Sequence, residues 1–121
     1  MIVGAFWGLW HAPVYFIQGT AQSFLRSQSG FWAGLLLFTA TTIAISVTFT
    51  WVFNNTRGSV LIAALLHGAN NVWINYFLTD PATEILGITI WSTVLWAALA
   101  VVLLLVYKPA HLSRSTTRQT E

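Results

Sequence analysis

The stretch "FWAGLLLFTATTIAISVTFTWVF", residues 31–53, decides the fold because it runs for 23 residues without a charged side chain. The hydrocarbon core of a bilayer is about 30 Å thick and is crossed by about 20 helical residues. A second stretch, "ILGITIWSTVLWAALAVVLLLVY" at residues 85–107, has the same length and is also uncharged. Over the whole chain 56% of the residues are hydrophobic and 7% are charged. The sequence therefore predicts an all-α membrane protein with two clear spans.

Two more apolar segments complete the predicted bundle. Residues 59–78 are long enough for a third span, and residues 1–18 form a shorter fourth segment that Pro13 is expected to bend. The segment 1–18 lacks the basic start and the small-residue cleavage site of a signal peptide, so we interpret it as a retained helix. The predicted architecture is a polytopic bundle of about four transmembrane helices at residues 1–108, followed by a polar cytoplasmic tail at 109–121.

The basic residues predict the orientation of this bundle. Four alternating helices place Arg57 and the basic residues of the tail on one side of the membrane and Arg26 alone on the other. Cytoplasmic loops carry an excess of Lys and Arg, so both termini are predicted to be cytoplasmic. The chain has no cysteine, which excludes disulfides and cysteine-ligated metals, and its basic tail is too short and mixed for a nucleic-acid module.

Two of the predicted helices carry a histidine in their interior. At about 1.5 Å of rise per residue, His11 and His67 lie roughly 15 Å and 13 Å from the basic side. Side chains four residues apart share a helix face, so Trp7, His11 and Tyr15 are expected to form one face. The polar stripe expected opposite this face contains His67, Asn71 and Asn75, with Asn70 beside it. We expect a shared pocket open toward the basic side, and a functional role for the histidines, because ionisable residues inside membranes are rare.

Hydroxyl residues are frequent in the segment 39–50. Those expected on one helix face are Thr39, Thr42, Ser46 and Thr50. Small polar side chains commonly hydrogen-bond between membrane helices. We therefore assign this face to helix packing and not to chemistry.

Two motifs around the histidines resemble a known family. "WGLWHAP", residues 7–13, resembles the second motif of the CPBP intramembrane proteases, the CAAX-protease and bacteriocin-processing group also called the Abi family, with Trp7 in place of the usual phenylalanine. "HGANN", residues 67–71, resembles their third motif. The resemblance implies an intramembrane endopeptidase that acts on prenylated or leader-type peptides in a bacterial or archaeal plasma membrane.

The resemblance also implies roles for individual residues. His11, His67 and Asn71 would be catalytic, and Trp7 and Asn70 would support them. His11 would help to activate water, whereas His67 and Asn71 would donate hydrogen bonds to the oxyanion. The implied partners are membrane lipid and a peptide or prenylated peptide, with no nucleic acid.

The first motif of the family, a glutamate pair followed by an arginine, is not found in this sequence. It belongs upstream of His11, and the acidic residues of the chain are Asp80, Glu84 and Glu121. We therefore expect the chain to correspond to the C-terminal part of the family core, to lack its N-terminal helices as partners, and to be inactive as written. The alternative is a non-enzymatic membrane protein on the same scaffold, such as a bacteriocin self-immunity or interaction protein.

Zinc is the cofactor that the metalloprotease label of the family suggests. A catalytic zinc site takes about three protein ligands and a water. His11 and His67 supply two ligands. Zinc is therefore not favoured, and no other cofactor is predicted.

Overall fold

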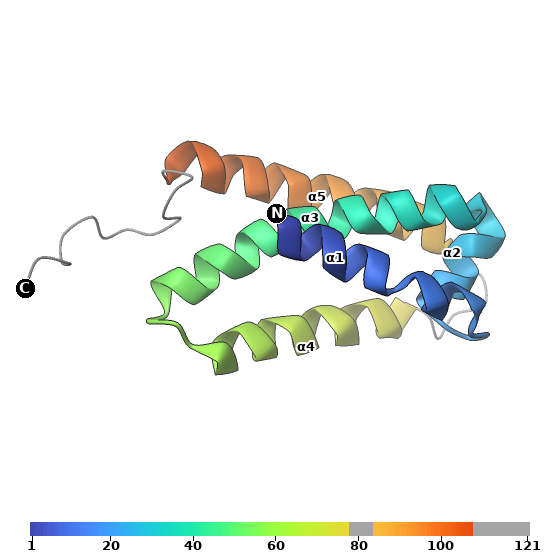
Figure 1. Cartoon of the computed structure of the whole chain (residues 1–121), viewed down its shortest axis with the longest axis horizontal. Helices are drawn as coiled ribbons and strands as arrows, with labels where there is room; N and C mark the ends of the chain where they lie inside the picture. The colour runs from blue at the N-terminus through green and yellow to red at the C-terminus, as the bar shows by residue number, and fades with distance from the viewer. Residues whose placement is uncertain (78–83, 108–121) are drawn as a thin grey trace, which may run out of the picture.

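The structure is a computed structural model that describes residues 1–77 and 84–107, the side chains of 73–77 excepted. In these ranges the helices are α1 (Ile2–Trp10), the 3-10 helix η1 (Ala12–Phe16), α2 (Ala21–Ser29), α3 (Phe31–Asn55), α4 (Val60–Phe77) and α5 (Ile85–Val106) (Figure 1). No strand occurs among the described residues. The prediction of an all-α helix bundle is confirmed. The proposed tail at 109–121 lies outside the described residues, so its separation from the bundle stays a prediction.

Helices α3 and α5 form the long pair of the bundle. They have 25 and 22 residues with mean hydropathies of 1.8 and 2.3, and both are long and apolar enough to cross a membrane. The Thr41 hydroxyl hydrogen-bonds to the Thr93 hydroxyl, and Val47 packs against Ala100 further along both helices. The two helices therefore run in the same direction, which requires the chain to return between them through α4.

Helix α1 packs against α3 through two glycines. A Cβ atom on Gly4 or Gly8 would lie 2.7 Å from backbone atoms of α3, closer than atoms can approach. The Thr42 hydroxyl donates to the Gly4 carbonyl at 2.9 Å. This backbone contact is the packing that glycines four residues apart allow in membrane bundles.

The sequence predicts that the hydroxyl face of α3 serves helix packing. The structure agrees with this only in part. The Thr42 hydroxyl lies 2.9 Å from the Gly4 carbonyl of α1 and equally close to the Thr39 carbonyl of its own helix, whereas Ser46 and Thr50 donate only to carbonyls of their own helix. The Thr39 hydroxyl is buried, with no hydrogen-bond partner among the described residues. The second bond between helices comes from Thr41, on a different face, which pairs with α5.

The segment 1–18 is not the single bent helix that the sequence predicts. Helix α1 ends at Trp10, His11 is its C-cap, and the 3-10 helix η1 follows with Pro13 in its first turn. Proline has no N–H and its ring clashes with the preceding turn, so the α-helix stops instead of bending. Tyr15 consequently does not line the cavity with Trp7 and His11, and its side chain is buried in a cluster with Leu25, Leu35 and Ile85.

The segment between the first two predicted spans is also helical. Thr20 caps α2 by accepting a hydrogen bond from the Ser23 N–H at 3.1 Å, and Gly30, with φ of 82°, turns the chain into α3. Leu25 of α2 packs with Tyr15, Leu35 and Ile85 in a buried cluster. Helix α2 therefore closes the end of the bundle where α3 and α5 begin (Figure 1).

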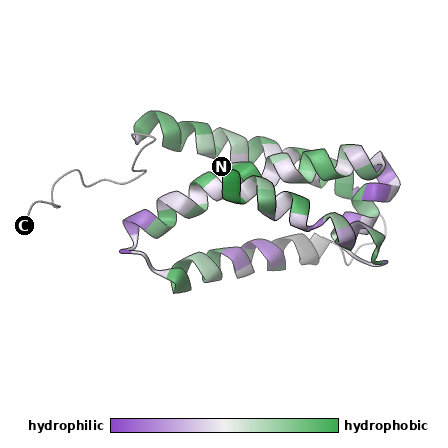
Figure 2. Cartoon of the chain, viewed as in Figure 1, coloured by the Kyte–Doolittle hydropathy of each residue, from purple (hydrophilic) through white to green (hydrophobic). Residues whose placement is uncertain are grey.

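Helix α4 is the least embedded element. No residue at 60–72 is buried, and large apolar side chains such as Leu61 and Val72 are about 70% exposed. Figure 2 shows hydrophilic residues midway along α4, after its apolar start. An apolar helix with such exposure needs lipid or further protein around it.

Candidate active site

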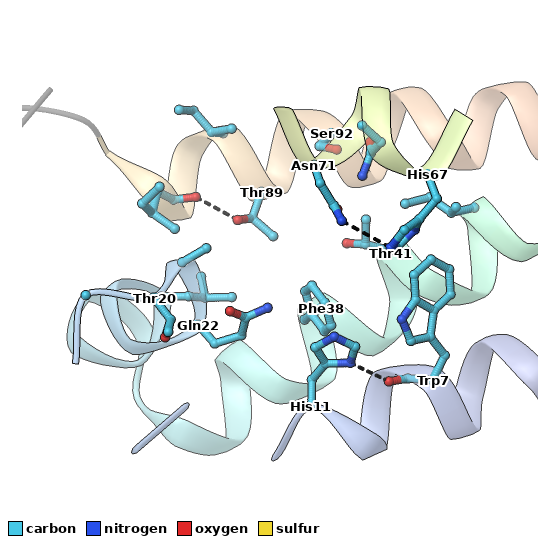
Figure 3. Close-up of a pocket in the computed structure, with 17 residues that line it drawn as sticks. Trp7, His11, Thr20, Gln22, Phe38, Thr41, His67, Asn71, Thr89 and Ser92 are labelled. Atoms are coloured by element: carbon cyan, nitrogen blue, oxygen red, sulfur yellow. Dashed lines mark hydrogen bonds between the residues drawn. The ribbon is translucent and has the colours of Figure 1, made fainter. Parts of the chain in front are cut away.

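A cavity of about 380 Å³ lies among the five α-helices, with His11 and His67 both in its wall. Figure 3 shows the two imidazoles in one pocket, from α1 and α4. The shared pocket predicted from the sequence is therefore present. It brings together histidines separated by 55 intervening residues of chain.

The sequence predicts that the cavity opens toward the basic loop. The structure contradicts this prediction. From the histidines the cavity wall continues to Thr20 and Gln22 beside α2 and to Thr89 near the start of α5. This is the end of the bundle opposite Arg57. The predicted direction is wrong because aromatic rings pack around His67: the Phe49 ring lies 6.2 Å from the imidazole and 6.0 Å from the Trp7 indole, centroid to centroid.

His11 is held by the end of its own helix. Its Nδ1–H donates to the Trp7 carbonyl at 2.7 Å, in the last turn of α1, where helix carbonyls are open to side-chain donors. The ring also packs against Phe38, with 5.1 Å between centroids. This bond fixes the proton on Nδ1, so that Nε2 is the ring nitrogen left to act as base or ligand.

His67 is oriented by Asn71, one helical turn further along α4. The Asn71 amide nitrogen donates to Nε2 of His67 at 3.1 Å. Because Nε2 accepts this bond, the proton of the neutral ring sits on Nδ1. The two histidines are thus held by opposite ring nitrogens: His11 presents a lone pair on Nε2, and His67 has a donor at Nδ1.

The tautomer of His67 can be measured directly. In Asn71→Leu the bond to Nε2 is lost, and we expect the single Nδ1–H form to become a mixture of both tautomers. The ¹⁵N chemical shifts of selectively labelled histidines measure this. The signals of His11 serve as the internal control, since its partner is a backbone carbonyl. An unchanged His67 spectrum in the variant would contradict the assignment.

Trp7 connects the two motif helices. Its indole lies 5.3 Å from the His67 ring and 6.5 Å from the His11 ring, centroid to centroid. It therefore contacts one imidazole through its side chain and fixes the other through its carbonyl. The supporting role of Trp7 stays a prediction, and these are the contacts through which it would act.

The remaining predicted residues are only partly placed. Asn70 lines the cavity and also an adjoining apolar groove of about 590 Å³ between α4 and α5. The side chain of Asn75 lies outside the described part of the structure. Polar residues of the wall that the sequence did not single out are Thr20, Gln22, Thr41, Thr89 and Ser92.

The described residues do not fit a zinc site. No group of three His, Asp or Glu side chains lies close enough there to hold a metal ion. His11 and His67 would give two of the roughly three protein ligands that catalytic zinc requires. Nor does any carboxylate line the cavity in the described ranges. The two imidazoles by themselves therefore do not make a catalytic zinc site.

Both histidine motifs lie inside a segment matched by a protein-family model. Residues 1–73 match the family described as type II CAAX prenyl endopeptidase Rce1-like. The chain belongs to this family. Its membership and its apolar helices α3 and α5 identify an integral membrane protein, and the resemblance inferred from the two motifs is confirmed.

One similar curated protein is CAAX prenyl protease 2 of Methanococcus maripaludis. It is 30% identical over 89 residues, which are 74% of this chain and 29% of the relative. The chain thus spans less than a third of the length of this relative. No solved structure gave a significant match.

Proposed function

We propose that this chain supplies the histidine and asparagine part of the active site of an intramembrane endopeptidase that cleaves prenylated or leader-type peptides. The observation that carries the proposal is that His11, His67 and Asn71, from two motifs of the family-matched segment that are far apart in sequence, line one cavity. The cavity volume of about 380 Å³ falls in the range of small-molecule and short-peptide sites.

Each histidine has a role that its hydrogen bond supports. Hydrolysis of a peptide bond needs a base for water, donors for the oxyanion and a proton for the leaving amine. His11, with Nε2 unprotonated, takes part in activating water. His67, with its proton on Nδ1, and Asn71, which orients it, stabilise the oxyanion.

The carboxylate of the family reaction comes from outside the described wall. The glutamate pair of the family is not in the sequence, and the described cavity wall contains no Asp or Glu. We infer that the 121-residue chain binds peptide but does not cleave it. The second candidate is a non-enzymatic membrane protein on the same scaffold, such as a bacteriocin self-immunity or interaction protein.

Binding of a prenylated peptide separates the two candidates. In lipid nanodiscs, the chain is expected to bind a farnesylated peptide saturably and to bind the unprenylated twin at least tenfold more weakly, because the buried isoprenoid adds apolar contact area. Fluorescence anisotropy of labelled peptides measures both affinities. Absence of saturable binding to either peptide would favour the non-enzymatic candidate.

We also propose a multi-pass topology with the loop after α3 in the cytoplasm. Arg57 lies in that loop, whereas Arg26 lies on α2 at the other end of the bundle. The basic-residue rule then places the α2 end outside.

Cysteine labelling in intact cells tests this topology. Ser27→Cys on exposed α2 is expected to react with a membrane-impermeant maleimide, whereas Ser59→Cys in the loop before α4 reacts only after permeabilisation. The chain contains no native cysteine, so background labelling is absent. The reverse pattern would invert the orientation.

A further inference from the structure

Polar side chains of α2 are almost all bonded to the protein itself. The hydroxyls of Ser23, Ser27 and Ser29 donate to the carbonyls of residues 20, 24 and 25, respectively. The Gln28 side-chain oxygen accepts from the Leu86 N–H at 2.7 Å. The Arg26 guanidinium contacts the Tyr15 carbonyl and the Phe16 ring. Gln22 differs from them. Among the described residues it has no hydrogen bond, and it is the polar side chain of α2 that lines the cavity. Its carboxamide is therefore left for something that enters the cavity.

The position of Gln22 is well fixed. It lies in the first turn of α2, which Thr20 anchors by capping Ser23 and by donating to the Val14 and Ile17 carbonyls. One turn later Leu25 is buried in the cluster around Tyr15. Figure 3 shows the Gln22 carboxamide directed toward the middle of the cavity, on the side of Phe38 and His11. The side chain thus projects from a rigid wall and not from a loose surface.

The chemistry of the wall selects a neutral ligand. A carboxamide offers one acceptor oxygen and two N–H donors, which match the N–H and C=O of a peptide unit. No Lys, Arg, Asp or Glu lines the described cavity, so phosphate and carboxylate groups would find no countercharge. Leaving a partly buried amide unpaired is unfavourable, and a peptide main chain would pair with it in both directions.

We propose that Gln22 is a substrate-binding residue that pairs with the main chain of the peptide in the α2 half of the cavity. The histidines, from α1 and α4, line the adjoining part of the cavity, where we place the scissile bond. This inference rests on the proposed function, and it adds a peptide-anchoring residue outside both family motifs. Gln22 sets the position of the peptide along the cavity, and takes no part in proton transfer.

Binding to the full chain in nanodiscs tests the role of Gln22. The probe is a synthetic farnesylated peptide labelled for fluorescence anisotropy. Gln22→Ala is expected to weaken binding about tenfold, the loss of one or two neutral hydrogen bonds. Gln22→Asn, which keeps the amide on a shorter stem, is expected to fall in between. Gln18→Ala is the matched control: the same residue type close by in the chain, exposed and outside the cavity wall, with unchanged affinity.

Peptides with single N-methylated peptide bonds identify the partner. At one position, N-methylation is expected to weaken binding to the wild type about tenfold and to have no further effect on Gln22→Ala. Thermal unfolding verifies that the variants are folded. Wild-type affinity in Gln22→Ala would overturn this inference and leave the proposed function standing. No saturable binding by the wild type would overturn both.

Discussion

Addition of a helix carrying the glutamate pair of the family, upstream of Met1, is expected to raise the rate of peptide cleavage by a factor of about 10² to 10⁴ over the 121-residue chain. The factor is what a positioned general base contributes to proton transfer. In the described cavity the imidazoles of His11 and His67 have fixed partners, but no carboxylate is present to share the water. The lengthened chain would complete the site.

The controls separate chemistry from folding. The same helix with both glutamates changed to glutamine supplies the packing without the base, and is expected to leave the rate at the level of the short chain. His11→Ala and His67→Ala in the lengthened chain are expected to abolish the gain. Release of product from a farnesylated peptide, followed by mass spectrometry, measures all of them. Histidine-dependent cleavage by the short chain would show that the base has been misplaced.

Hydropathy and motif spacing predicted the parts of the fold that depend on one segment at a time. The spans 31–53 and 85–107 appear as α3 and α5 because their uncharged length is a local property. His11, His67 and Asn71 were singled out as candidate site residues because the motifs are local too. Their shared cavity was predicted from the matching depth of the two histidines in the membrane. That depth is preserved because α3 and α4 run in opposite directions.

The rest depends on tertiary contacts. The polar segment around α2 has the composition of a connecting loop, and its helix is stabilised by the Thr20 cap and by burial of Leu25 against Tyr15. The direction of the cavity is set by the Trp7 and Phe49 rings, which meet only after folding. Gln22 belongs to neither motif. It is recognised only in the structure, where, within the described ranges, its amide has no hydrogen bond and the other polar side chains of α2 do. A local signal did exist for α1: Gly4 and Gly8, four residues apart in "GAFWG", have the spacing of a close helix contact.

That glycine pair gives the second large effect, expected from Gly8→Ala. A Cβ on Gly8 would lie 2.7 Å from the Thr39 Cα and from the Thr39 and Thr42 hydroxyl oxygens. Because one of these atoms is backbone, α1 must move away from α3. Overpacking of this kind costs about 1–3 kcal/mol in the free energy of unfolding. The displacement would also draw Trp7 off His67, so binding of the farnesylated peptide is expected to fall with stability.

Gly68→Ala is the matched control for the glycine prediction. It is the same change in another apolar helix, α4, where an added Cβ meets no atom within 4 Å. Removing a glycine from a helix interior stabilises the helix by up to about 1 kcal/mol, so this variant is expected to unfold no more easily than the wild type. Denaturant titration in detergent micelles, followed by tryptophan fluorescence, compares the two. Equal stability of Gly8→Ala and Gly68→Ala would mean that α1 does not rest on α3 through its glycines, and the cavity wall that holds His11 would then need another support.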